Sequence, residues 1–145
     1  MVPTLLGRLQ TRIFLLGIVG SVVTAAIAPI LMIHADLAER YRIAFVVLAV
    51  VAVLGLGWEC LYHLLMQWRW EKDWPTLFGL ITLLPEGFLI WELLNFGLVP
   101  SISGPVSPYA FWLDFSAVWL ATWLVANGPL RVLSIGWRFK GGRFL

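Results

Sequence analysis

Half of the acidic side chains in this sequence lie inside long apolar segments. The chain has eight Asp and Glu residues, and four of them interrupt runs of Leu, Ile, Val and Trp: Glu59, Glu86, Glu92 and Asp114. A charge at the centre of a bilayer costs at least about 2.5 kcal/mol, and loss of water favours the neutral carboxylic acid. We therefore expect these side chains to face a bundle interior, a partner protein or water.

The positions of these residues along the chain predict their depths. At a rise of about 1.5 Å per residue, Glu86 falls near mid-membrane, between Pro85 and Gly87, a context that would loosen a helix and free a carbonyl. Glu59 falls nearer the inner boundary, and His63 shares its helix face because it follows four residues later. Three further polar residues fall in the outer third: Glu92, Asn95 and Asp114.

Two roles fit this set of polar residues. Stacked by depth, they would form a discontinuous path for protons or cations, although Glu86 and Glu92 point about 120° apart on an ideal helix. Alternatively, they make buried hydrogen bonds that hold helices to each other or to another subunit. No Lys or Arg falls inside the four apolar segments, so we expect these carboxylates to lack a cationic partner in this chain.

Other chemistry has less support in the sequence. A metal site at Glu59 and His63 would need ligands from several helices, and the second histidine, His34, falls at the opposite boundary. Cys60 is the only cysteine, which excludes an internal disulfide. No G-x-S-x-G or P-loop motif is present, so we expect no metal and no cofactor. An enzyme that uses Glu59, His63 and Asp114 remains an alternative, although no known sequence motif supports it.

Two helix faces carry residues suited to close contact. The first apolar segment has small residues at helical spacing, which permit close helix packing within the bundle or against another subunit: Gly17, Gly20, Ser21, Thr24, Ala25 and Ala28. The last segment has an aromatic face, for packing, lipid contact, or a groove for a quinone, carotenoid or lipid tail: Trp112, Phe115, Trp119 and Trp123.

Four apolar segments must position these residues. The chain has 145 residues, 61% hydrophobic and 12% charged, whereas soluble domains average about 45–50% apolar and 25% charged. Each segment is near the length of about 20 residues that spans a bilayer as a helix. The sequence predicts one all-α domain, an integral membrane bundle of four antiparallel transmembrane helices, at residues 13–33, 43–66, 75–99 and 109–130.

Basic residues predict the orientation. Of ten Lys and Arg residues, eight fall on the side that holds both termini, and only Arg40 and Arg42 fall on the other, so both termini are expected in the cytoplasm. Residues 131–145 should lie on the inner membrane surface, where four basic side chains would contact anionic lipid headgroups: Arg131, Arg138, Lys140 and Arg143.

Three classes of function remain open. The first is an accessory or structural subunit of a larger membrane complex, because the chain is small and its carboxylates lack partners. The second is an oligomeric transporter or channel for protons or cations. The third is a membrane enzyme or cofactor-binding protein. In each case we expect a multi-pass protein of a bacterial inner membrane, whose partners are lipids and other subunits or copies of itself, with no nucleic acid.

Overall fold

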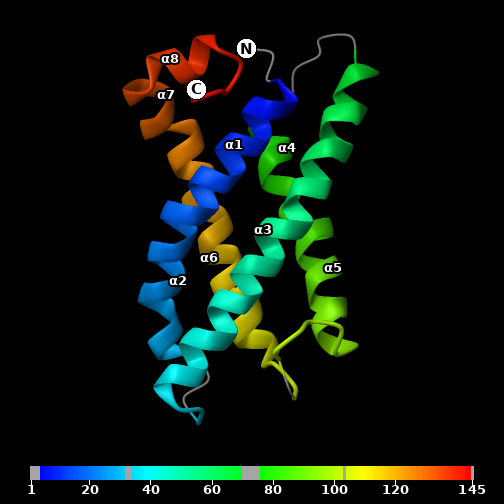
Figure 1. Ribbon diagram of the computed structural model, residues 1–145, viewed down its shortest axis with the longest axis vertical. Coiled ribbons are helices and arrows are strands. Elements are labelled where there is room, and N and C mark those ends of the chain that lie inside the picture. Colours follow the sequence, from blue (N-terminus) through cyan, green and yellow to red (C-terminus); the bar gives the residue numbers. More distant parts are fainter. Residues whose placement is uncertain (1–3, 32–33, 70–75, 103, 145) are drawn as a thin grey trace.

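The protein is an all-helical bundle with four helices long and apolar enough to cross a membrane (Figure 1). The computed structural model describes residues 4–31, 34–69, 76–102 and 104–144, and these contain no strand. The four long helices cover Leu5–Ile30, Leu37–Gln67, Thr76–Asn95 and Pro108–Leu133. The prediction of an all-α fold with four helices of membrane-spanning length is confirmed. Both termini lie at the same end of the bundle.

The first long helix consists of α1 (Leu5–Leu15), a π-helical turn (Leu16–Gly20), α2 (Ser21–Ile27) and a 3-10 turn (Ala28–Ile30). It begins well before the predicted start at residue 13, because Thr4 caps it by accepting a hydrogen bond from the Gly7 amide at 3.1 Å. This extra length places Arg8 and Arg12 inside the helix. The predicted end at residue 33 lies outside the described residues.

The second and third long helices differ in continuity. α3 (Leu37–Gln67) is unbroken and starts at the N-cap Asp36. The third is interrupted at Thr82, between α4 (Thr76–Ile81) and α5 (Leu83–Asn95). Pro85 cannot donate a hydrogen bond to the preceding turn, which agrees with the expected loosening beside Glu86. The predicted start of this segment at residue 75 lies outside the described residues.

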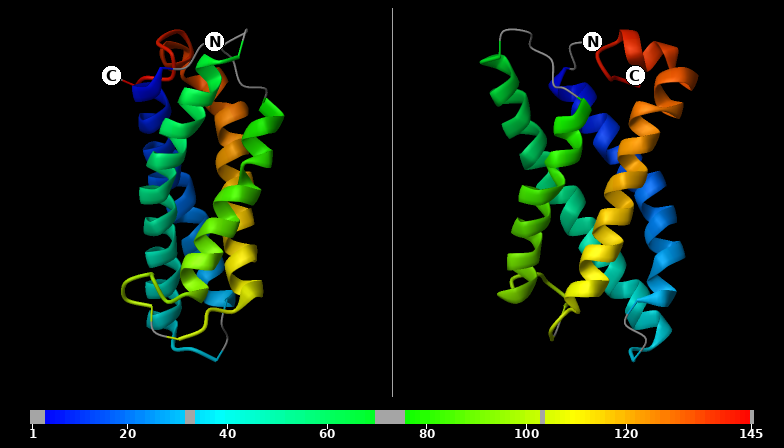
Figure 2. Two further views of the ribbon diagram at one scale, coloured as in Figure 1. Left: turned by 90° about the vertical axis from the view of Figure 1, so that its right-hand side faces the viewer. Right: turned by 180° about the vertical axis from the view of Figure 1, so that it is seen from behind.

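The helix α6 (Pro108–Asn127) packs against the first helix, α4 and α5 (Figure 2). A large apolar core fills the space between α3, α5 and α6, toward the end away from the termini. Its most buried members are Val51, Ile90, Phe111, Phe115 and Val118. This core holds the three helices that carry the polar residues.

The small residues of the first helix form two sets at four-residue spacing, and one set faces the inside of the bundle. Gly20, Thr24 and Ala28 are buried, and a Cβ at Gly20 would lie 3.3 Å from Leu48. The other set lies toward the edge. Gly17 is exposed, and a Cβ added there would have no neighbouring atom within 4 Å, while Ser21 and Ala25 are half-buried.

The C-terminal segment packs back onto α1. After α7 (Pro129–Leu133) and α8 (Ile135–Phe139), the backbone oxygen of Gly141 accepts from the Thr4 amide at 3.0 Å. The Trp137 indole donates to Thr11 at 2.8 Å, and the Phe144 amide donates to Gln10 at 3.1 Å. The tail is therefore held against the protein, and its predicted contact with lipid headgroups stays a prediction. Its four basic side chains are exposed: Arg131, Arg138, Lys140 and Arg143.

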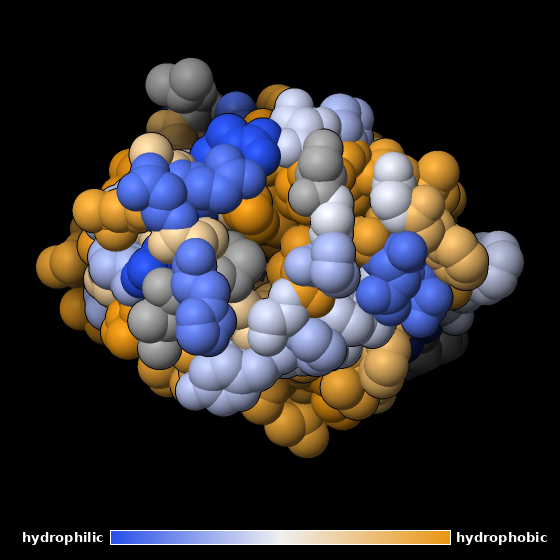
Figure 3. Space-filling model, turned by 90° about the horizontal axis from the view of Figure 1, so that it is seen from below, coloured by the Kyte–Doolittle hydropathy of each residue, from blue (hydrophilic) through white to orange (hydrophobic). Residues whose placement is uncertain are grey.

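The opposite end of the bundle is formed by the loops between α2 and α3 and between α5 and α6. Figure 3 shows hydrophilic residues over these loops and hydrophobic atoms around the margin. Arg42 pairs with Glu39 at 2.5 Å and donates to the Ser101 carbonyl. Arg40 donates to the carbonyls of Ala35 and Pro29. Both arginines of this end thus tie loops to the start of α3.

Candidate functional site

Two arginines of α1 meet two glutamates from other helices inside the bundle. Arg8 Nε donates to Glu59 on α3 at 2.7 Å, and Arg12 Nη1 donates to the same carboxylate at 3.1 Å. Arg12 also contacts both oxygens of Glu86 on α5, one of them at 3.3 Å from Nη1. These four side chains form the Arg–Glu cluster.

The prediction that these carboxylates lack a cation in the chain is wrong for Glu59 and Glu86. Arg12 comes just before the apolar run, so sequence reasoning placed it outside the membrane. The helix starts at Leu5 instead, and residues four apart share a helix face, so Arg8 and Arg12 turn inward together. The pair of arginines four residues apart, after a threonine able to cap a helix, was the available signal.

Residues of three helices enclose the Arg12 guanidinium. The Arg12 side chain is 9% exposed and that of Glu86 only 1%. A Cβ on Gly55 of α3 would overlap the guanidinium group, so only glycine leaves room for it there. The guanidinium carbon lies 5.4 Å from the Trp119 ring centre on α6, within the range of a cation–π contact.

The charges of the cluster balance, with two arginines against two glutamates. Removing charges from water is costly, and their attraction compensates only with good geometry and further hydrogen bonds. The paired contact of Arg12 with both oxygens of Glu86 is the bidentate arrangement that meets this requirement. Because the four residues come from α1, α3 and α5, the cluster fixes these helices at one relative depth.

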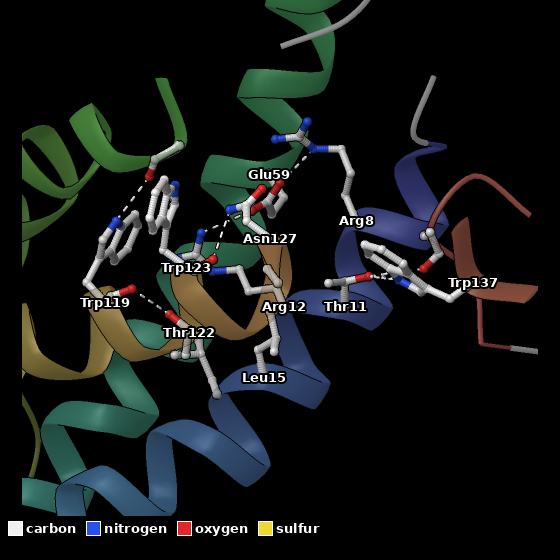
Figure 4. A pocket seen from close by; sticks show the side chains of 15 residues that line it. Arg8, Thr11, Arg12, Leu15, Glu59, Trp119, Thr122, Trp123, Asn127 and Trp137 are labelled. Carbon is white, nitrogen blue, oxygen red and sulfur yellow. Dashed lines mark hydrogen bonds and ion pairs between the residues drawn. The ribbon is translucent and has the colours of Figure 1, made fainter. Parts of the chain in front are cut away.

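A pocket of about 260 Å³ lies beside the cluster. Figure 4 shows it between α1, α3, α4, α6 and the C-terminal segment. Indole rings form much of the wall: Trp119, Trp123 and Trp137. The polar residues that line it are Arg8, Thr11, Arg12, Glu59, Thr122 and Asn127.

The predicted aromatic face divides between core and pocket. Trp112 and Phe115 pack against each other at 6.1 Å between ring centres, and a Cβ on Gly87 would meet both below 3.0 Å. Trp119 and Trp123 line the pocket instead. Their indole N–H groups donate to carbonyls of α4, Gly79 at 3.0 Å and Thr76 at 3.1 Å, which holds the half-helix α4 in place.

Asp114 lies apart from the cluster, in the other half of the bundle. It is 7% exposed, and Thr24 donates to its Oδ2 at 3.5 Å. Its Oδ1 is buried without a hydrogen-bond partner among the described residues. Val51, Phe115 and Val118 belong to the apolar core packed beside it. Thus Asp114 is buried like Glu86, but unlike Glu86 it has no described cation to neutralise it.

The remaining predicted residues do not join the cluster. His63 contacts Gln67 on its own helix at 3.3 Å. Glu92 and Asn95 are exposed at the side of α5. The structure therefore brings Glu59 and Glu86 together, but it does not align them with His63, Glu92 or Asn95 as one polar track.

No protein-family model, curated protein or solved structure matches the chain. Among the described residues, no three His, Cys, Asp or Glu side chains are grouped so that they could hold a metal ion. Three features of the structure bear on function: the balanced cluster, the pocket beside it, and the exposed polar face of α5.

Proposed function

We propose that this chain is a non-catalytic subunit of a larger membrane complex, in a bacterial inner membrane with both termini in the cytoplasm. The observation that carries the proposal is a polar patch on the outward face of α5. Glu92 and Asn95 are exposed there, next to Phe88 at 56% and Phe96 at 72% exposure. We call these four residues the α5 face.

The spacing of the α5 face suits a helical partner. Phe88 and Glu92 are four residues apart, and Asn95 and Phe96 follow one turn later, so all four lie along one stripe. Aromatic residues on both sides of a polar pair supply apolar contact area, while the polar pair sets the register. A partner helix packed along this stripe would cover all of them.

The chemistry of Glu92 indicates what the partner offers. Among the described residues, none forms an ion pair or side-chain hydrogen bond with Glu92. It lies in the last turn of α5, which ends at Asn95, where the helix dipole disfavours a negative charge. A Lys, an Arg or a hydrogen-bond donor on the partner would compensate for both effects.

The buried carboxylates support a structural role more than an ion path. Glu59 and Glu86 are satisfied by arginines of the same chain. Asp114 is separated from the pocket by the apolar residues Val51, Phe115 and Val118, which pack between it and Trp119. An ion path would therefore have to avoid this apolar layer, for example at an interface between copies of the chain.

Co-purification tests the proposal. The tagged chain is isolated from its native membranes in mild detergent, and bound proteins are quantified by mass spectrometry. We expect a stoichiometric membrane partner, retained in Glu39→Gln and reduced at least about tenfold in Glu92→Gln, since losing a charge partner costs roughly 2 kcal/mol or more. Glu39 is the matched control because it pairs with Arg42 at the end of the bundle.

Recovery of the wild-type chain without any stoichiometric partner would overturn the proposal. A partner that binds the Glu92→Gln variant as well as the wild type would overturn the α5 face as the interface and remove the observation on which the proposal rests.

A further inference from the structure

The pocket beside the Arg–Glu cluster has the size of a site for a small headgroup. Its volume of about 260 Å³ is slightly below the range of roughly 300–1,000 Å³ typical of ligand pockets. It is lined by residues of the first and last membrane-length helices, by Glu59 of α3 and Gly79 of α4, and by Trp137 and Gly142 of the C-terminal segment. A ligand would therefore reach it at membrane depth, where molecules dissolved in the lipid are concentrated.

The indole rings of the wall are fixed in place. The N–H groups of Trp119 and Trp123 are bonded to α4 carbonyls, and that of Trp137 is bonded to Thr11. Their donors are thus used within the protein, and the rings offer apolar surface to an occupant (Figure 4). Fixed aromatic rings favour a planar ring over a flexible chain.

The balanced charges of the cluster favour an uncharged occupant. Arg8 and Arg12 are matched by Glu59 and Glu86. An anionic headgroup would have to displace a carboxylate from its arginine, and a cationic headgroup would have to displace an arginine. Either exchange breaks a largely buried ion pair, which is strongly unfavourable.

Hydrogen-bond donors remain available at the polar side of the pocket. Arg8 uses Nε for Glu59 and Nη1 for the Met66 sulfur, while Nη2 has no partner among the described residues. Arg12 Nε packs against Gly55 and is fully buried, so it is not available to an occupant. Asn127 uses one amide hydrogen for the Trp123 carbonyl at 2.8 Å, leaving the second. The free Arg8 and Asn127 donors suit oxygen acceptors on a neutral ring.

We propose that this pocket binds the headgroup of a quinone-type lipid: a planar, uncharged ring with carbonyl oxygens. The ring packs among Trp119, Trp123 and Trp137, and its oxygens accept hydrogen bonds from Arg8 and Asn127. The cluster provides donors without a net charge. This binding site is independent of the α5 face, so it holds whether or not a partner subunit is present.

Binding is measured by calorimetry on the purified full chain in detergent, with a benzoquinone that carries a decyl tail. We expect saturable binding at one site per chain. Ala126→Phe fills the pocket and should weaken binding at least tenfold, whereas Ala26→Phe should leave it unchanged. Ala126 lines the pocket, and Ala26 is an exposed alanine of α2.

A second variant covers the case in which Ala126→Phe misfolds. Asn127→Leu removes the amide while keeping a similar size, and it should weaken binding several-fold. Decanol and decyl phosphate serve as ligands with the same tail but different headgroups, and both should bind more weakly than the quinone. Non-saturable uptake, equal binding by wild type and Asn127→Leu, or tighter binding of either control ligand would overturn the proposal.

Discussion

Arg12 bonds to carboxylates from two other helices, Glu59 on α3 and Glu86 on α5. Its guanidinium group packs against Gly55, where a Cβ would collide with it, and lies near the Trp119 ring. All of these contacts are made by this one group. At the residue scale, the stability of the bundle is therefore most sensitive to Arg12.

Arg12→Met should destabilise the protein strongly, because it leaves Glu86 buried without its cation. Removing one partner of a buried ion pair typically costs about 3–5 kcal/mol. The measurement is unfolding in detergent with increasing denaturant, followed by helical circular dichroism. The exposed Arg131→Met serves as the control, with a change of no more than about 0.5 kcal/mol.

The double variant Arg12→Met, Glu86→Leu sharpens this prediction. Since it removes the uncompensated charge together with its partner, it should be more stable than the sum of the two single changes implies. Additive effects would mean that Arg12 and Glu86 do not interact.

At the scale of elements, the first helix connects the two ends of the chain. Its inner face carries the arginines of the cluster, and Gly7 on the same helix lies against the backbone of Gly141 and Gly142. Thr11 donates to the Gly142 carbonyl at 3.0 Å. The C-terminal segment was predicted to lie on the membrane surface, and that contact stays a prediction; the structure shows that its backbone is anchored to α1.

Gly7→Val should release the C-terminal segment, because any Cβ at this position overlaps the Gly141 carbonyl. Limited trypsin digestion should then cut faster at Arg138, Lys140 and Arg143 than in the wild type. Gly17→Val is the matched control, since nothing lies within 4 Å of a Cβ there. Equal cleavage of the two variants would contradict this docking.

At the scale of the whole molecule, all four long helices run between two distinct ends. Both termini share one end with the C-terminal helices α7 and α8, and the loops between α2 and α3 and between α5 and α6 form the other (Figure 1). The eight-to-two distribution of basic residues predicts which end faces the cytoplasm.

Cysteine labelling in intact cells tests this orientation. In a Cys60→Ala background, Ser107→Cys should react with a membrane-impermeant maleimide, and Lys140→Cys should react only after permeabilisation. Both positions are exposed, so access depends on the side of the membrane. The reverse labelling pattern would overturn the predicted orientation.

The apolar composition was sufficient to predict four long helices, because a chain in lipid must satisfy its backbone hydrogen bonds within each helix. The position of Glu86 in a long apolar segment likewise marked it as a residue that should face the bundle interior, a partner protein or water. The interruption of the third helix agrees with the loosening expected at Pro85, because proline has no backbone N–H to donate in any fold. These features depend only on local sequence.

The partners of the carboxylates depended on contacts far apart in the chain. Arg12 and Glu86 are 74 residues apart, and nothing local indicates that they meet. The start of the first helix at Leu5 was missed because a hydropathy scale counts every arginine as polar, even one that is buried against a carboxylate. The sequence by itself thus determined which segments are helical and apolar. Only the tertiary structure decided which charges neutralise each other, because that depends on how helices pack and at what relative depth.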